Sequence, residues 1–214
     1  DQPLSVTTAL QTLKLTAIDQ FGNALSVLPK VTWETTAKPD GGVATGKLSS
    51  SVATVGFNKA GQYTVKATTG TVSATISFDV VQTLRAIAVS GADGRTVNPA
   101  SVISVTSATS QFTTVPVDQF GAAMPGTSDI QWERITAPAD AVTDIKSSGT
   151  SLRVTFDRAG TYNIRGSVGD VSVSLKMEVV QSLATIDVTP NTSKLNYGAK
   201  QVFKATGLDQ FGVA

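Results

Sequence analysis

The tetrapeptide Asp-Gln-Phe-Gly occurs three times in this chain of 214 residues, starting at Asp19, Asp118 and Asp209. The first two copies are 99 residues apart, and the last two are 91 residues apart. A period near a hundred residues is too long for a solenoid repeat, which runs about 20–50 residues. It suits whole domains joined in tandem. The sequence therefore predicts an array of similar domains.

Other landmarks keep the offset of 99 residues between the first and second repeats. The matching pairs are Trp33 and Trp132, Phe57 and Phe156, Tyr63 and Tyr162, and Gln82 and Gln181. The length difference lies after the recurring Val-Val-Gln, where Gln82 and Gln181 stand. Surface connections tolerate a change of length and packed strands do not, so the domain body is constant.

The composition excludes several classes of function. There are 17 Lys and Arg against 16 Asp and Glu, so the net charge of +1 favours no nucleic-acid partner and no charged substrate. Cys and His are absent, which excludes zinc sites of the Cys/His type, thiol nucleophiles and Ser-His-Asp triads. No apolar run approaches the ~20 residues that cross a bilayer, so we predict no transmembrane segment in this chain.

Short segments of alternating apolar and polar residues fill the middle repeat. They are 84–89, 102–106, 111–117, 130–135, 151–156, 162–165 and 171–180. Clusters rich in Gly, Asp and Pro separate them, and no segment keeps a helical period for three turns. The stretch 137–142 has room for one helical turn. This pattern predicts an all-β sandwich or barrel.

Two aromatic positions narrow the fold to tandem immunoglobulin-like β-sandwiches. Trp33 and Trp132 fall on the third strand of each body, where that fold packs an aromatic ring between its sheets. Tyr63 and Tyr162 stand in a recurring Ala-Gly-x-Tyr motif. They match the tyrosine corner, in which the hydroxyl bonds to the backbone a few residues upstream.

In this register we predict three segments. Residues 1–81 form an immunoglobulin-like domain that lacks its first strand, 82–180 a complete one, and 181–214 the N-terminal fragment of a third. The incomplete ends have two explanations. The chain is a piece of a longer array, or residues 183–189 supply the missing strand to the first domain of a neighbouring molecule. Head-to-tail exchange of that kind would build a filament.

Several motifs together resemble bacterial immunoglobulin-like (Big) domains. They are the stretch Asp19–Asn23, the strand Val31–Glu34, the segment Ala60–Val65 and the closing strand Val72–Val81. The resemblance covers both bodies and the tail. It implies tandem arrays in secreted or surface-attached bacterial proteins, among them adhesins, surface-layer proteins and extracellular polysaccharide-acting enzymes. In such proteins the domains usually act as spacers.

The tetrapeptide is the first candidate site. Its Asp could offer oxygen to calcium, which takes 6–8 oxygen ligands, but no series of spaced acidic residues supplies the others. An Asx-turn with Gly at positive φ is the stronger interpretation, and we expect the Phe to fold over the end of the core. Calcium between domains, held by Asp93, Asp170 or Asp187, stays open as the one candidate cofactor.

Two further candidates have structural interpretations. Trp33 and Trp132 could stack on sugars, but their matching positions inside strands favour the core. Glu34 and Glu133 could suggest a glycoside-hydrolase pair, yet they lie on the strand face opposite the Trp and recur once per domain. We therefore predict no catalytic, cofactor-binding or metal residue, and no enzyme.

The sequence thus predicts a non-enzymatic structural or spacer array of an extracellular bacterial surface protein. Its expected partners are neighbouring immunoglobulin-like domains of the same or adjacent chains, with cell-surface polysaccharide as a further candidate. Two alternatives stay open. One is a subunit of a surface layer or filament assembled through inter-molecular strand contacts. The other is an adhesin or polysaccharide-binding module.

Overall fold

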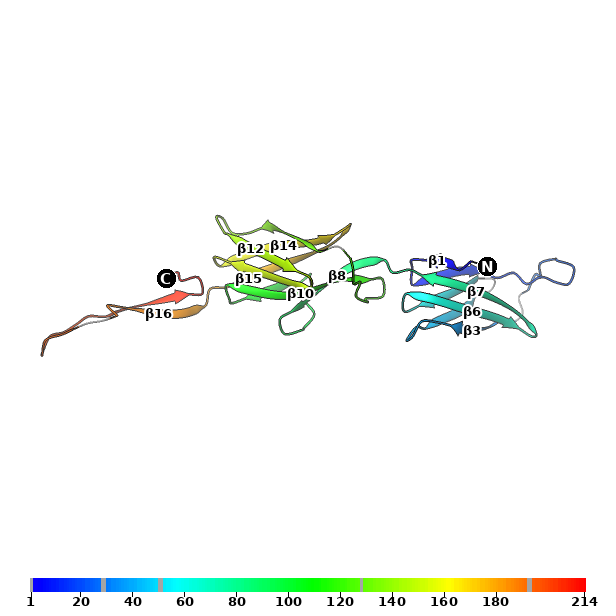
Figure 1. Ribbon diagram of the computed structural model, residues 1–214, viewed down its shortest axis with the longest axis horizontal. Coiled ribbons are helices and arrows are strands. Elements are labelled where there is room, and N and C mark those ends of the chain that lie inside the picture. The colour runs from blue at the N-terminus through cyan, green and yellow to red at the C-terminus, as the bar shows by residue number, and fades with distance from the viewer. Residues whose placement is uncertain (1, 28–29, 50–51, 128, 192–193) are drawn as a thin grey trace. The chain divides into compact units, whose positions relative to one another are not determined.

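The computed structural model describes residues 2–27, 30–49, 52–127, 129–191 and 194–214. These residues form strands and turns and no helix, so none of them forms a helix that could cross a membrane (Figure 1). The chain divides into two compact units, Asp1–Arg85 with Val117–Pro125, and Ala86–Pro116 with Gly126–Ala214. The loop 117–125 of the second repeat therefore belongs to the first unit.

The first unit contains a sandwich of two sheets. The sheets have the orders β1-β7-β6-β3 and β2-β5-β4, and β1 pairs parallel with β7. The strands are β1 (Leu4–Val6), β2 (Leu10–Lys14), β3 (Thr32–Ala37), β4 (Ala44–Ser49), β5 (Val52–Phe57), β6 (Gly61–Thr69) and β7 (Val72–Val80). The buried cluster in this sandwich is Val6, Val55, Phe57, Tyr63, Val65, Phe78 and Val80.

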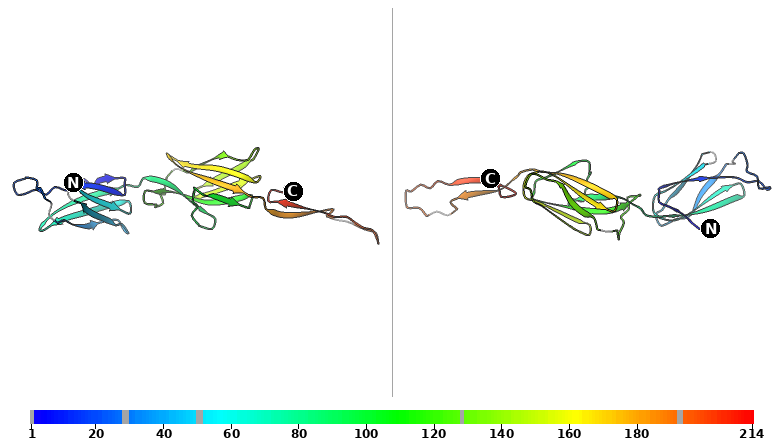
Figure 2. Two further views of the ribbon diagram at one scale, coloured as in Figure 1. Left: turned by 180° about the vertical axis from the view of Figure 1, so that it is seen from behind. Right: turned by 90° about the horizontal axis from the view of Figure 1, so that it is seen from above.

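The second unit contains a sandwich with sheets β9-β15-β14-β11 and β8-β10-β13-β12 (Figure 2). Its strands are β8 (Leu84–Gly91), β9 (Val102–Val105), β10 (Thr109–Asp118), β11 (Gln131–Thr136), β12 (Thr143–Ser148), β13 (Ser151–Phe156), β14 (Gly160–Val168) and β15 (Val171–Val179). The strand orders match those of the first sandwich, with β8 in addition. The prediction of tandem immunoglobulin-like β-sandwiches is confirmed.

Alternation places the core residues as predicted. On β13, Leu152, Val154 and Phe156 are buried on one face, and each contributes about 1.5–3 kcal/mol. The prediction of a helical turn over 137–142 is wrong, because Ala141 N donates to Pro138 O in a turn. Strand β12 was missed, since this edge strand has a single large apolar residue, Ile145.

The third repeat contributes one antiparallel hairpin to the second unit. It consists of β16 (Leu183–Thr189) and β17 (Lys204–Asp209). All seven residues of β16 are exposed. The segment bounds 1–81, 82–180 and 181–214 stay a prediction, since the compact units combine residues from neighbouring repeats.

The tyrosine corner is confirmed in both sandwiches. Tyr63 donates its hydroxyl hydrogen to Lys59 O, and Tyr162 donates to Arg158 O, each at 2.9 Å. Burial raises the pKa of both phenols. The Tyr162 ring also packs on Phe156, with centroids 4.8 Å apart. Each corner therefore ties the start of one strand to the turn before it.

Replacing Tyr162 by phenylalanine is expected to lower the free energy of unfolding of the second sandwich by about 1 kcal/mol, the net contribution of one hydrogen bond. Urea unfolding followed by Trp132 fluorescence in a Trp33→Phe background measures it. Tyr197 is fully exposed, so Tyr197→Phe is the matched control and should be neutral. Equal stability of Tyr162→Phe and the control would contradict a stabilising corner.

Candidate functional site at the tetrapeptide loop

The tetrapeptide folds as an Asx-turn in all three repeats. Asp118 is the best example, because its Oδ1 accepts hydrogen bonds from Phe120 N and Ala122 N, both at 2.9 Å. Gly121 follows with a φ of 80°, in the left-handed region that favours glycine. The same two carboxylate bonds recur at Asp19 and Asp209. The predicted turn is confirmed.

The loop of the second repeat is also bonded to the residues that directly follow β7. Gln82 Nε2 donates to Asp118 Oδ2 at 2.9 Å. Gln119 Oε1 accepts from Thr83 N at 2.8 Å, and Gln119 Nε2 donates to Val81 O at 2.8 Å. We name residues 81–83 together with 118–120 the junction clasp. The single side chain of Gln119 thus bonds to one backbone donor and one backbone acceptor of the segment 81–83 that connects β7 to β8.

The same clasp forms again one repeat later, within the second unit. Gln181 Nε2 donates to Asp209 Oδ2 at 3.0 Å. Gln210 Oε1 accepts from Ser182 N at 2.8 Å, and Gln210 Nε2 donates to Val180 O at 2.7 Å. The atoms and their roles are identical. The recurrence shows that the arrangement is a property of the repeat.

Phe120 adds an apolar contact to the hydrogen bonds of the junction clasp. Its ring packs against the buried cluster of the first sandwich. Phe120 therefore does fold over the end of a core, as expected, and that core belongs to the sandwich of the preceding repeat. Gln119 holds the loop against the end of β7, and the ring meets the core that lies there. Phe21, in the first repeat, is 79% exposed.

The junction clasp sets the charge state of Asp118. Burial by itself raises the pKa of this carboxyl, but hydrogen bonds from the Gln82 side chain and from Phe120 N and Ala122 N outweigh it. The pKa of Asp118 therefore lies below its usual value of 3.8. A depressed folded-state pKa means that the carboxylate stabilises the fold above the unfolded value. That contribution is lost as pH falls through the folded value.

Acidification should consequently weaken the first unit through Asp118. Between about pH 7 and about pH 3, we expect the melting temperature of the first sandwich to fall more in the wild type than in Asp118→Asn. Thermal unfolding followed by Trp33 fluorescence in a Trp132→Phe background measures the difference. Identical pH profiles for the two proteins would show that the Asp118 carboxylate does not stabilise the junction.

The Trp residues lie in the cores, as predicted. Both are half-buried, and their indole nitrogens are shielded from water with no hydrogen-bond partner among the described residues. A methyl group on Gly166 would lie 2.7 Å from the Trp132 ring, and one on Gly46 would lie 3.0 Å from Trp33 Cγ. Each ring therefore covers a glycine of its own sandwich. This packing leaves neither ring as an open stacking platform.

The acidic candidates do not converge on a site. Glu34 and Glu133 are exposed, as predicted. Asp93 forms an ion pair with Arg95, with Oδ2 and Nε 3.6 Å apart. In the part of the chain that the structure describes, no three His, Cys, Asp or Glu side chains come together as metal ligands. Calcium at Asp93, Asp170 or Asp187 stays a prediction.

Comparisons with known proteins give similarity only to solved structures. No family model matches the chain, and no curated protein sequence matches it. Domains 4 and 5 of the S-layer protein SbsC are 22% identical over 77% of this chain and 79% of theirs, with a TM-score of 0.36. The Escherichia coli adhesin FdeC is 16% identical over 99% of this chain and 72% of its own, with a TM-score of 0.33.

A third similar structure is invasin, a bacterial integrin-binding protein. It is 18% identical over 87% of this chain, with a TM-score of 0.34. This chain spans 40% of the invasin chain.

Proposed function

We propose that this chain is a non-enzymatic spacer segment of an extracellular bacterial surface protein, built of Big-type domains whose relative motion the junction clasp restricts. The recurrence of the clasp carries the proposal. Three residues separate β7 from β8, and three separate β15 from β16. Both connections use the same glutamine, aspartate and backbone atoms.

The expected free energies of these contacts favour a junction clasp that is formed for most of the time. The clasp contains four hydrogen bonds, including one that Thr83 Oγ1 donates to Gln119 Oε1 at 3.1 Å. Each contributes about 0.5–1.5 kcal/mol after the loss of bonds to water. The Phe120 ring adds the burial of apolar surface at about 25 cal/mol per Å². The combined free energy is several times the thermal energy. A chain of domains joined in this way would project or space other parts of a surface protein.

Gln119 offers the sharpest test of this role. Gln119→Ala removes all three hydrogen bonds from its side chain to Val81 and Thr83 while leaving the Asx-turn of Asp118 intact. We expect the two sandwiches to sample a wider range of relative orientations. The residual dipolar couplings of the two sandwiches should then fit one common alignment tensor less well than those of the wild type. The first unit should lose some stability, because each lost hydrogen bond contributes about 0.5–1.5 kcal/mol. The second sandwich should keep its stability within about 0.5 kcal/mol.

Gln20→Ala is the matched control, because Gln20 occupies the equivalent position and makes no hydrogen bond among the described residues. Its dipolar couplings should equal those of the wild type. Unchanged couplings in Gln119→Ala would refute a stiffening role for the junction clasp.

A further inference from the structure

Two lysines share the outer face of one sheet in the first sandwich. Strands β2, β5 and β4 contain Lys14 and Lys47 and no Asp or Glu. On β5, Val55 is buried, so its neighbour Thr54 faces outward, and Lys47 lies opposite Thr54. Lys14 lies opposite Val52, on the other side of β5. Both lysines are exposed, and neither has a hydrogen bond or ion pair among the described residues.

The matching sheet of the second sandwich, β8-β10-β13-β12, also has cations on its outer face. Arg153 on β13 and Lys146 on β12 lie directly opposite each other, and both are exposed. Like charges in this arrangement destabilise the strand pair. Lys146 Nζ lies 3.0 Å from Asp144 Oδ2, whereas Arg153 has no such partner in the described part of the chain. An anion in contact with both cations would relieve their repulsion.

The outer face of the other sheet carries no cationic excess in either sandwich. In the first sandwich that face has Lys66 with Glu34 and Asp79. In the second it has two cations and two anions, Arg165, Lys176, Glu133 and Glu178. The net charge of +1 for the whole chain therefore conceals a local excess of positive charge on one sheet of each sandwich.

Hydrogen-bonding groups stand beside these cations, and aromatic rings do not. Gln111 on β10 lies opposite Arg153, and Thr54 lies opposite Lys47. The aromatic residues of these strands are all buried, namely Phe57, Phe112 and Phe156. Cations bind anionic substituents of a sugar, and amide and hydroxyl groups bind its hydroxyls. A neutral glycan would find no exposed ring on which to stack.

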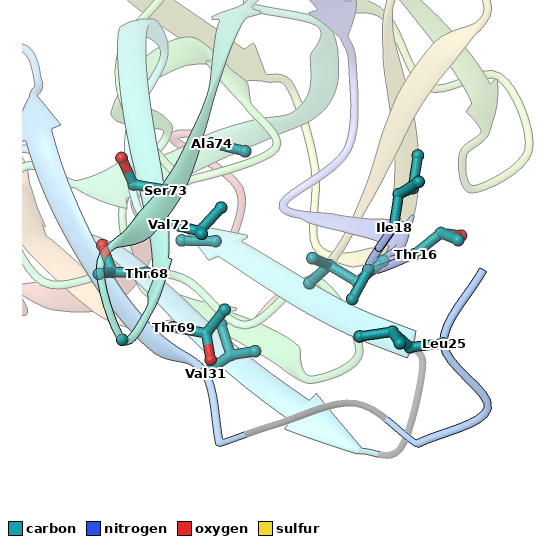
Figure 3. Close-up of a pocket in the computed structure, with 13 residues that line it drawn as sticks. Thr16, Ile18, Leu25, Val31, Thr68, Thr69, Val72, Ser73 and Ala74 are labelled. Carbon is teal, nitrogen blue, oxygen red and sulfur yellow. The ribbon is translucent and has the colours of Figure 1, made fainter. Parts of the chain in front are cut away.

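The groove of the first sandwich has a different chemistry. It measures about 500 Å³, with Ile18 and Leu25 on one side and Val72 on the other (Figure 3). None of its lining residues carries a charge. An anionic ligand would gain no ionic contact there, so the flat outer face is the surface that suits it.

We propose that the outer faces of the β2-β5-β4 and β8-β10-β13-β12 sheets bind an acidic polysaccharide, whose sugars carry carboxylate, sulfate or phosphate groups. Charge spacing favours this partner over a nucleic acid. Lys14 and Lys47 lie on either side of β5, so about 10 Å or more separates their strands at ~4.8 Å per strand spacing. A nucleic-acid strand has one charge per ~3.4 Å, which so sparse a set of cations does not match.

Each face binds weakly, because its few charges are exposed to water. Repetition of the face along an array strengthens the binding of a long polymer through avidity. This surface does not depend on the spacer role, because none of its cations belongs to the junction clasp.

Dextran sulfate and unsubstituted dextran test the dependence on charge, since they share one backbone. In a nuclear magnetic resonance titration at low salt, dextran sulfate should shift the amide signals around Lys47 and Arg153, and dextran should not. Added salt should weaken the binding by screening. Polygalacturonate separates carboxylate from sulfate recognition, and binding of either acidic polymer supports the proposal. Failure of both to bind, equal binding of dextran, or tighter binding of single-stranded oligothymidylate would overturn it.

A combined variant tests whether these faces are the binding surface. Its affinity for dextran sulfate should fall by about tenfold or more, because it lacks four exposed ionic contacts: Lys14→Gln, Lys47→Gln, Lys146→Gln and Arg153→Gln. The matched control loses four positive charges elsewhere and should bind as the wild type does: Lys38→Gln, Lys66→Gln, Arg165→Gln and Lys176→Gln. Thermal unfolding checks that both variants fold. An equal loss of affinity in both would show attraction by net charge alone and would refute a defined surface.

Discussion

Replacing Trp132 by alanine is expected to lower the free energy of unfolding of the second sandwich by about 3–5 kcal/mol. The ring lies so close to Gly166 that even a methyl group there would overlap it. Removing the ring leaves a cavity that the glycine beneath cannot fill. Urea unfolding measured by circular dichroism gives the change, with the transition of the first sandwich as an internal reference.

Glu133→Ala is the matched control for this substitution. Glu133 is the next residue on β11, it is exposed, and its loss should change stability by less than about 0.5 kcal/mol. If Trp132→Ala proved as stable as Glu133→Ala, the ring would be an exposed platform. The interpretation of Trp132 as a sugar-stacking residue would then regain support.

Replacing Phe120 by alanine should destabilise the first sandwich, although Phe120 belongs to the second repeat. The ring packs on the buried cluster that contains Phe57 and Tyr63. Because the ring is partly rather than fully buried, we expect a loss of about 1–3 kcal/mol. Thermal unfolding followed by Trp33 fluorescence in a Trp132→Phe background reports on that sandwich alone.

Phe21→Ala provides the comparison. Phe21 has the same place in its own tetrapeptide and is largely exposed, so its loss should be neutral. The decisive quantity is which sandwich melts earlier in Phe120→Ala. A lowered melting temperature of the second sandwich, with that of the first unchanged, would show that the Phe120 ring stabilises the core of its own repeat.

The strands and their faces could be predicted from the sequence because they follow from alternation. Leu152, Val154 and Phe156 show the two-residue period of a strand with one buried face, and their burial agrees with it. Strand β12 shows the limit. An edge strand buries little, so its sequence has little need of apolar residues, and Thr143–Ser148 resembles a loop.

The junction clasp could be predicted only in part. The Asx-turn depends on residues within one tetrapeptide, so the local sequence contained it. The bonds of Gln119 are different, because they join residues 36 and 38 positions apart. Recurrence of Gln at 82 and 181, and of Gln at 119 and 210, was the one pattern that indicated them. The residues around a Phe in a connecting loop do not indicate against which core its ring will pack.

The parallel pairing of β9 with β15 has a mechanical consequence. Val102 to Val105 lie beside Lys176 to Val179 in register, and β9 follows the first strand β8 whereas β15 is the last strand of the same sandwich. Once β8 has detached, tension along the chain would pull β9 and β15 in opposite directions along their own axes. Their hydrogen bonds would then be sheared together and would not open one after another from an end. A chain held under tension at both ends would therefore resist extension at such a sandwich until this short ladder failed as a whole.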